Sequence, residues 1–178
     1  LDLQVIEGLP DYFYPDEHAK PEGRYLEPTP YDGERLGDWL ETLPHSPQLP
    51  GGMTSTEMMA WGGAFALGDW QWDVIGERRS TDQLTLGRAM IATFLEACLD
   101  RGVTLHTETP ATELVRENGR VSGVVVEHDD EERTYSASDG VVLNTGSYDW
   151  NRKMVEDLKQ LPAEHAASVA VPGATGDG

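Results

Sequence analysis

The sequence has 178 residues, of which 13 are lysine or arginine and 32 are aspartate or glutamate, so its formal net charge is −19. This length allows a domain with a sizeable buried core. The acidic excess argues against nucleic-acid partners and anionic membrane surfaces, because both select cationic side chains. A single cysteine, Cys98, rules out an internal disulfide. There is no apolar run of about 20 residues and no basic-then-apolar leader, so we expect a soluble cytoplasmic protein.

Residues 1–52 are predicted to form a packed arm rich in proline and aromatic residues. Eight prolines interrupt it too often for a long helix. Its tyrosines, leucines and tryptophan, however, supply apolar surface that disordered segments lack. We expect a strand near Leu3–Ile6 and a short helix that begins after Asp32. The apolar face of that helix comprises Leu36, Trp39, Leu40 and Leu43.

Residues 53–86 are predicted to be a connecting segment rich in methionine and tryptophan. Thr54 or Ser55 would cap a helix that runs towards Trp61, and the two glycines that follow would weaken it. The simpler explanation for the apolar side chains of this segment is core packing or a lid. The alternative is an apolar patch for a hydrophobic substrate or a partner chain, and the sequence leaves both open.

Residues 87–178 have a clearer periodicity. Apolar residues recur at helical spacing from Gly87 to Gly102, and Gly102 suits the left-handed conformation that ends a helix. The segment Val103–Thr107 is then predicted to be a buried strand. A single later run, Val141–Leu143, has the same apolar character and is predicted to be another buried strand.

Between these two runs we expect a three-stranded antiparallel meander. The dipeptide Asn118-Gly119 separates the alternating runs Ala111–Glu117 and Arg120–His128. It is a strong hairpin signal, because both turn positions need positive φ. A second tight turn at Asp129-Asp130 leads into Arg133–Ala137. After the meander, a helix is expected from about Asn151 to Leu158, with Pro162 ending it.

In addition to this order of elements, the sequence contains several motifs that resemble those of a known family. The motifs are Leu86-Gly-Arg-Ala-Met-Ile, Gly102-Val-Thr-Leu-His-Thr, Glu113-Leu-Val-Arg-Glu-Asn-Gly-Arg-Val-Ser-Gly-Val-Val-Val and Gly140-Val-Val-Leu-Asn-Thr-Gly-Ser-Tyr. Over residues 84–178 they resemble flavoproteins of the fumarate reductase and succinate dehydrogenase class. Residues 9–43 resemble its 3-ketosteroid Δ1-dehydrogenase branch more specifically, through Leu9-Pro-Asp-Tyr-Phe, Gly23-Arg-Tyr-Leu-Glu-Pro and Asp32-Gly-Glu-Arg-Leu-Gly.

The resemblance implies an α/β fold: a partial FAD-binding, Rossmann-like domain that includes the meander. Such flavoproteins open with a strand, a G-x-G-x-x-G turn and a helix whose N-terminus holds the pyrophosphate. This sequence contains no such turn after a strand. Family chains also continue well beyond the motif at residues 175–178. We therefore expect an internal fragment of a larger flavoenzyme, which binds FAD in the intact parent but not by itself.

The resemblance also implies which residues contact the cofactor. Asn144, Thr145 and Gly146 form a turn after an apolar strand, where nucleotides bind in such sheets, and glycine lets the backbone approach a ligand closely. An ordinary strand-ending turn is the alternative explanation. Ala111 matches a small residue whose backbone contacts the adenine ring, and Asp177 matches the acidic residue of a cofactor-contacting Gly-Asp-Gly motif. The family usually has Ala-Thr-Gly-Gly at the turn, so Ser147 is a departure.

Tyr12 matches an active-site tyrosine that assists proton abstraction in the ketosteroid branch. Tyrosine side chains have an unperturbed pKa of about 10, so a tyrosine acts as a base only where neighbours depress that pKa or share its proton. Tyr14, Tyr25 and Tyr31 are alternatives nearby, and a plain packing role is another.

The parent protein is thus expected to be an FAD-dependent oxidoreductase that dehydrogenates a carbon–carbon bond next to a carbonyl. The expected partner is a small hydrophobic keto substrate such as a steroid. One alternative is a fumarate reductase-like enzyme for a small unsaturated acid. Another is a non-catalytic, self-associating module that exposes sheet surface to a second copy. The histidines and Cys98 lack metal-ligand spacing, so no metal is expected.

Overall fold

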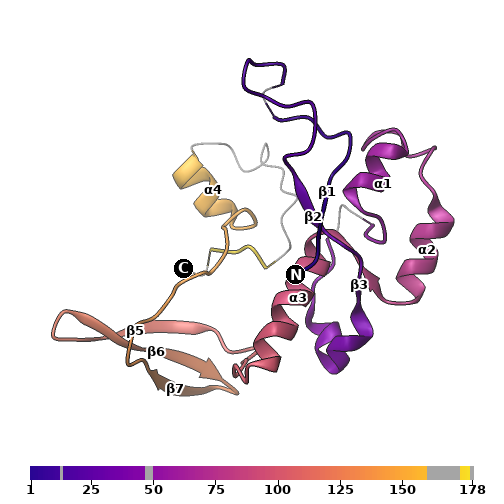
Figure 1. Cartoon of the computed structure of the whole chain (residues 1–178). Helices are drawn as coiled ribbons and strands as arrows, with labels where there is room; N and C mark the ends of the chain where they lie inside the picture. Colours follow the sequence, from indigo (N-terminus) through magenta and orange to yellow (C-terminus); the bar gives the residue numbers. More distant parts are fainter. Residues whose placement is uncertain (13, 47–49, 160–172, 177–178) are drawn as a thin grey trace. The chain divides into compact units, whose positions relative to one another are not determined.

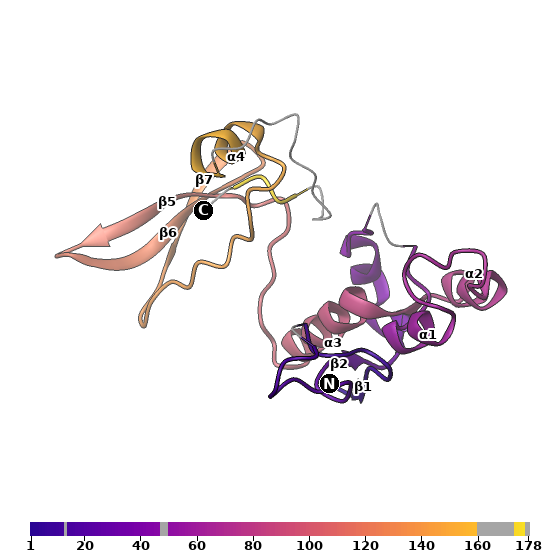
Figure 2. The same ribbon diagram turned by 90° about the horizontal axis from the view of Figure 1, so that it is seen from above.

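The computed structural model describes residues 1–12, 14–46, 50–159 and 173–176. They form two compact units, Leu1–Val103 and Thr104–Gly178, here termed the N-terminal and C-terminal units. Figure 1 labels their helices and strands, and Figure 2 shows the same ribbon from above. In the part of the chain that the structure describes, no helix is long and apolar enough to cross a membrane.

The N-terminal unit contains two small antiparallel sheets. Strand β1 (Leu3–Val5) pairs with β2 (Leu26–Pro28), which confirms the predicted opening strand. Strand β3 (Tyr31–Asp32) pairs with β4 (Gln83–Leu84) and so joins parts of the chain about fifty residues apart. The first ladder closes the proline-rich arm on itself, and the second joins the arm to the segment directly before the helix at Leu86.

The helix predicted after Asp32 is present as a 3-10 helix, η1 (Gly33–Thr42). Asp32 caps it by accepting a hydrogen bond from the Glu34 backbone N–H at 3.1 Å. Gly37 interrupts it with a φ of 54°, so the element consists of two short pieces. The predicted apolar face is confirmed. Its members lie in or against a core formed by Tyr31, Leu36, Leu43, Leu84, Ala89 and Ala92.

A second core is formed by the methionine- and tryptophan-rich segment. Met53, Trp70 and Ile75 are buried and Met58 and Trp61 pack against them, so core packing is confirmed for these residues. Other side chains of the segment are exposed, namely Phe65, Leu67 and Trp72. The segment contains two helices, α1 (Ser55–Ala60) and α2 (Trp72–Ser80). The second was not predicted, because it carries a central glycine and buries only Ile75.

Of the two predicted caps, Thr54 is the one that caps α1, through a reciprocal capping box with Glu57, and Ser55 is the first residue of the helix. The Thr54 Oγ1 accepts from the Glu57 N–H at 3.1 Å, and the Glu57 carboxylate accepts from the Thr54 N–H at 2.9 Å. Arg78 of α2 then donates to both Glu57 oxygens, at 2.6 and 2.7 Å. Burial by itself would raise the pKa of Glu57, but the hydrogen bonds from Arg78 and Thr54 have the larger effect, so the pKa lies below its ordinary value. This two-point ion pair joins α1 to α2.

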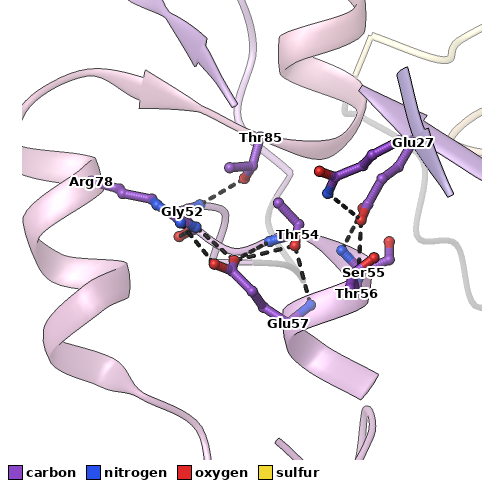
Figure 3. Close-up of polar contacts among 9 residues, drawn as sticks. Glu27, Gly52, Thr54, Ser55, Thr56, Glu57, Arg78 and Thr85 are labelled. Atoms are coloured by element: carbon purple, nitrogen blue, oxygen red, sulfur yellow. Dashed lines mark hydrogen bonds and ion pairs between the residues drawn. The ribbon is translucent and has the colours of Figure 1, made fainter. Parts of the chain in front are cut away.

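Glu27 is the buried acid of the N-terminal unit and its side chain meets the start of α1 (Figure 3). One carboxylate oxygen accepts from the Ser55 N–H at 2.5 Å. The other accepts from the Thr56 N–H at 3.0 Å and from Gln4 Nε2 at 3.0 Å. Burial raises the pKa of Glu27, but these bonds outweigh burial and hold the pKa below its ordinary value. The carboxylate therefore ties the β1–β2 hairpin to α1.

Helix α3 (Leu86–Asp100) agrees with the predicted helix to within two residues at each end. Gly102 follows it with a φ of 69°. The Gly102 N–H donates to the Leu99 carbonyl at 3.0 Å, and the Val103 N–H donates to the Cys98 carbonyl at 3.0 Å. These two bonds form a Schellman motif, so the predicted glycine stop is confirmed.

The C-terminal unit contains the predicted meander, in the order β5 (Ala111–Glu117), β6 (Arg120–His128) and β7 (Glu131–Ser136). Asn118 and Gly119 have φ angles of 50° and 81°, as the hairpin signal required. Asp129 and Asp130 also adopt positive φ, at 53° and 59°. The predicted last helix is α4 (Arg152–Lys159), and Pro162, its predicted stop, lies outside the described residues.

The structure differs from prediction at two apolar segments, Val103–Thr107 and Val141–Leu143. Neither is a strand. Val103, Val142 and Leu143 are instead exposed, at 47%, 91% and 56%. The physical reason is that a strand needs a neighbour for its N–H and C=O groups, and no described strand pairs with either segment. Apolar patterning alone therefore did not suffice to form these two strands.

Candidate cofactor-binding site

The candidate site lies in the C-terminal unit, at residues 144–147, where the sequence predicts a turn. The structure has an irregular segment there and forms its turn slightly later, at Asp149-Trp150. We keep the name turn for residues 144–147. Gly146 has a φ of 79°, and a Cβ placed on it would meet no atom within 4 Å. The turn is exposed throughout. Among the described residues, none accepts a hydrogen bond from the backbone N–H of Thr145 or Gly146. Exposed, unpaired N–H groups beside a positive-φ glycine are suited to bind an anionic or polar ligand.

A second segment, residues 173–176, lies directly against this turn. The Gly176 N–H donates to the Ser147 carbonyl at 3.1 Å, and the Trp150 N–H donates to the Ala174 carbonyl at 2.9 Å. Gly176 has a φ of 82°, and a Cβ there would lie only 2.9 Å from Tyr148 Cβ. A Cβ there would also lie 2.5 Å from Met154 Sδ, so only glycine fits this position without strain.

Asn151 joins the same two segments through its side chain. Its Oδ1 accepts from the Met154 N–H at 3.1 Å, which caps the first turn of α4. Its Nδ2 donates to the Thr175 carbonyl at 3.0 Å. Both ends of the carboxamide are therefore used, one for the helix and one for the 173–176 segment.

The surface beside the turn carries a small charge network. Asp149 accepts a short hydrogen bond from the Ser147 hydroxyl and pairs with Lys159 Nζ at 2.9 Å. The Ser147 bond and Lys159 hold the pKa of Asp149 below its ordinary value. Lys159 also lies over the Tyr148 ring, 5.2 Å from its centroid. Lys159, at the end of α4, thus contacts both Tyr148 and Asp149, which directly follow the turn.

The predicted cofactor residues are placed as follows. Asn144, Thr145 and Gly146 lie together in the exposed turn. Ala111 begins β5 in the same unit, where it pairs with Val126, and no hydrogen bond between described residues joins it to the turn. Asp177 lies outside the described residues, immediately after Gly176. The 173–176 segment thus brings the start of the Asp177 motif to the Thr145-Gly146 turn.

The predicted catalytic residue, Tyr12, lies in the N-terminal unit. Its side chain is 85% exposed, and its backbone N–H donates to the Tyr25 hydroxyl at 3.1 Å. Of the alternative tyrosines, Tyr14 and Tyr25 are also exposed. Tyr31 is buried, and burial together with the Glu96 carboxylate raises its pKa. A raised pKa keeps the Tyr31 hydroxyl protonated near neutral pH, so less of its deprotonated form is available to act as a base.

Sequence reasoning missed the part that Asn151 plays at this site. An asparagine directly before a helix is a recognisable N-cap signal, so its hydrogen bond to the Met154 N–H could have been predicted from the sequence. The bond to Thr175 spans 24 residues and has no local signal. No group of three or more His, Cys, Asp or Glu side chains in the described part of the chain could hold a metal ion.

Comparison with known proteins places this geometry in a family. The model of the FAD binding domain matches residues 5–178. A 3-oxosteroid 1-dehydrogenase of Mycolicibacterium smegmatis is 28% identical over all of this chain and 34% of its own length. A 4-oxocyclohexanecarboxylate 2-dehydrogenase of Sinomonas cyclohexanicum is 26% identical over 97% of this chain and 30% of its own.

Among solved structures, the 3-ketosteroid Δ1-dehydrogenase of Sterolibacterium denitrificans in complex with 1,4-androstadiene-3,17-dione matches with a TM-score of 0.76 and 30% identity. The match covers 99% of this chain and 35% of that one. The chain therefore spans about a third of the length of the relatives it matches.

The residues at the turn fit the dinucleotide that this family binds. Phosphate and adenine groups are bound in such folds largely through backbone N–H groups at glycine turns. The Thr145 and Gly146 N–H groups are exposed and unpaired among the described residues. The resemblance drawn from the sequence motifs is confirmed by a family match over nearly the whole chain. This chain belongs to the FAD binding domain family, and its architecture is that of part of an FAD-binding domain with a three-stranded antiparallel sheet.

Proposed function

We propose that this chain is one segment of an FAD-dependent oxidoreductase that dehydrogenates a carbon–carbon bond next to a ketone, with a steroid-like substrate. The observation that carries the proposal is the contact between the exposed Thr145-Gly146 turn and the 173–176 segment, through the Gly176 N–H and the Ser147 carbonyl. Two motifs that resemble cofactor-contacting motifs meet there. The relatives named 3-oxosteroid 1-dehydrogenase and 3-ketosteroid Δ1-dehydrogenase support the reaction and the substrate class.

In this proposal the chain binds and orients the cofactor. The backbone N–H groups of Thr145 and Gly146 donate to it, Asp177 accepts from it, and the Ala111 backbone lies along its adenine ring. When bound, FAD supplies the acceptor for the hydride that leaves the substrate. The protein must therefore supply a base that removes a proton from the carbon beside the ketone.

The experiment that tests the proposal uses the full-length protein. We expect it to purify with flavin absorbance and to lose that absorbance anaerobically when a 3-ketosteroid is added. Addition of 4-oxocyclohexanecarboxylate tests the smaller ketone, and fumarate with the reduced protein tests the alternative reaction. Protein that is colourless and takes up no added FAD would overturn the proposal. Loss of flavin absorbance with 4-oxocyclohexanecarboxylate alone would overturn the proposed steroid substrate but would support the proposed dehydrogenation reaction.

Tyr12 is proposed to assist the proton abstraction. A Tyr12→Phe variant should therefore lose about 10²–10⁴-fold in the rate of flavin reduction by substrate. Its flavin absorbance and its substrate Kd should be unchanged, because the ring remains. Stopped-flow single-turnover measurements isolate this step. Tyr14→Phe is the matched control, since Tyr14 is also an exposed tyrosine of the same arm. If the control loses as much rate as Tyr12→Phe, Tyr12 has no special role.

A further inference from the structure

We infer that Asn151 is a positioning residue for the cofactor, because its carboxamide sets the orientation of the peptide group between Thr175 and Gly176, one residue before Asp177. The inference rests on the proposed function and adds a residue to it. Asn151 itself need not touch the cofactor. It acts on the placement of the 173–176 segment, which leads to Asp177, against the 144–147 turn, which is proposed to bind the cofactor.

The geometry of one peptide group carries the inference. The carbonyl of Thr175 and the N–H of Gly176 belong to the same planar peptide unit. The carbonyl accepts from Asn151 Nδ2 at 3.0 Å, and the N–H donates to the Ser147 carbonyl at 3.1 Å. Both polar groups of this peptide are therefore hydrogen-bonded, the carbonyl to the Asn151 side chain and the N–H to the backbone of the 144–147 turn.

The conformation of Gly176 explains why such a restraint is needed. Glycine populates positive and negative φ about equally, so the peptide before Gly176 can rotate unless it is held. Gly176 has a φ of 82° in the structure. A rotated peptide would withdraw the N–H from Ser147 and would change the direction in which the chain continues to Asp177.

The chemistry of asparagine fits both tasks of the side chain. Oδ1 must accept from the Met154 N–H, and Nδ2 must donate to the Thr175 carbonyl. The oxygen and nitrogen assignment is thus dictated by the partners. Aspartate would keep the helix cap, because its oxygens accept equally well, but it has no proton to donate to Thr175 at neutral pH. This difference separates the positioning role from the capping role.

The test compares Asn151→Asp with Asn151→Ala in the full-length protein. Apoprotein is reconstituted with FAD, and the Kd is measured by quenching of flavin fluorescence. Both variants should bind FAD about tenfold more weakly than the natural protein, as expected from the loss of one hydrogen bond that orients the site. Hydrogen exchange of the Gly176 amide should also be faster in both apo variants.

Lys153→Ala is the matched control on the same helix. It removes the surface pair with Asp157 and a weaker attraction to Glu156, both on α4 itself, so FAD binding and Gly176 exchange should not change. An Asn151→Asp protein that binds FAD as tightly as the natural one would overturn the inference, because capping alone would then account for Asn151. Failure of the natural protein to bind FAD would instead overturn the proposed function. The exchange of the Gly176 amide is still measurable in that case.

Discussion

Replacing Gly52 with alanine is expected to destabilise the N-terminal unit by about 3 kcal/mol, from backbone strain and overpacking together. Gly52 has a φ of 77°, which disfavours any residue with a Cβ. A Cβ there would also lie 2.7 Å from the Ile75 carbonyl oxygen, which is held in α2 and cannot move aside as a side chain could. The Gly52 N–H donates to Thr85 Oγ1 at 3.0 Å, so a shift of this residue would also lengthen a buried hydrogen bond (Figure 3).

Gly51→Ala is the matched control for this prediction. Gly51 also has a positive φ, 69°, but a Cβ there would meet nothing within 4 Å. It should therefore cost only about 1 kcal/mol, the price of the backbone conformation. Urea unfolding followed by tryptophan fluorescence measures both changes, because four of the five tryptophans lie in the N-terminal unit. Equal losses in the two variants would show that the contact with Ile75 has no effect.

Replacing Glu27 with alanine is the second change for which we expect a large effect, again a loss of about 3 kcal/mol in the free energy of unfolding. Three donors lose their acceptor in this variant, the N–H groups of Ser55 and Thr56 and the amide of Gln4. These donors are partly buried. Without an acceptor they lose hydrogen bonds to water and gain none from the protein, which is unfavourable. Glu7→Ala, at an exposed glutamate next to β1, is the control and should change stability little.

The pH dependence of this effect follows from the pKa of Glu27, which lies below its ordinary value of about 4.5. A carboxyl whose folded pKa is depressed adds stability above the unfolded pKa and loses it as the pH falls through the folded pKa. The Glu27→Gln variant should therefore be less stable than the natural protein at neutral pH. This difference in the free energy of unfolding should become smaller as the pH falls below about 4.5. Urea unfolding at pH 7 and at pH 3 measures the difference. A difference of the same size at both would mean that ionisation of Glu27 does not contribute.

The features that could be predicted from the sequence are those decided by neighbouring residues. The capping box needs only Thr54 and Glu57, three residues apart. The stop at Gly102 and the turn at Asn118-Gly119 need only residues that tolerate positive φ. The cap, the stop and the turn lie close to where they were predicted, because the energies that favour them act within one or two turns of the chain. The reciprocal bond from Glu57 was not predicted, although its spacing from Thr54 indicates it.

The two strands predicted at Val103–Thr107 and Val141–Leu143 are absent from the structure, because local sequence does not determine strand pairing. Their composition is that of strands, but a strand exists only as part of a ladder, and the partner is a property of the whole fold. The same holds for α2, whose single buried residue, Ile75, finds its place beside Met53 and Trp70 in the second core. Periodicity could not reveal a helix with so little amphipathic pattern.

The sequence by itself determined the meander, helix α3 with its glycine stop, the position of α4, and the motifs that place the chain among FAD-binding domains. Only the tertiary structure decided that Glu27 meets the start of α1 and that the Thr175–Gly176 peptide lies between Asn151 and Ser147. The physical reason is the range of the interactions. Caps and turns are set by adjacent residues, whereas these contacts join residues more than twenty positions apart and exist only once the intervening chain has packed.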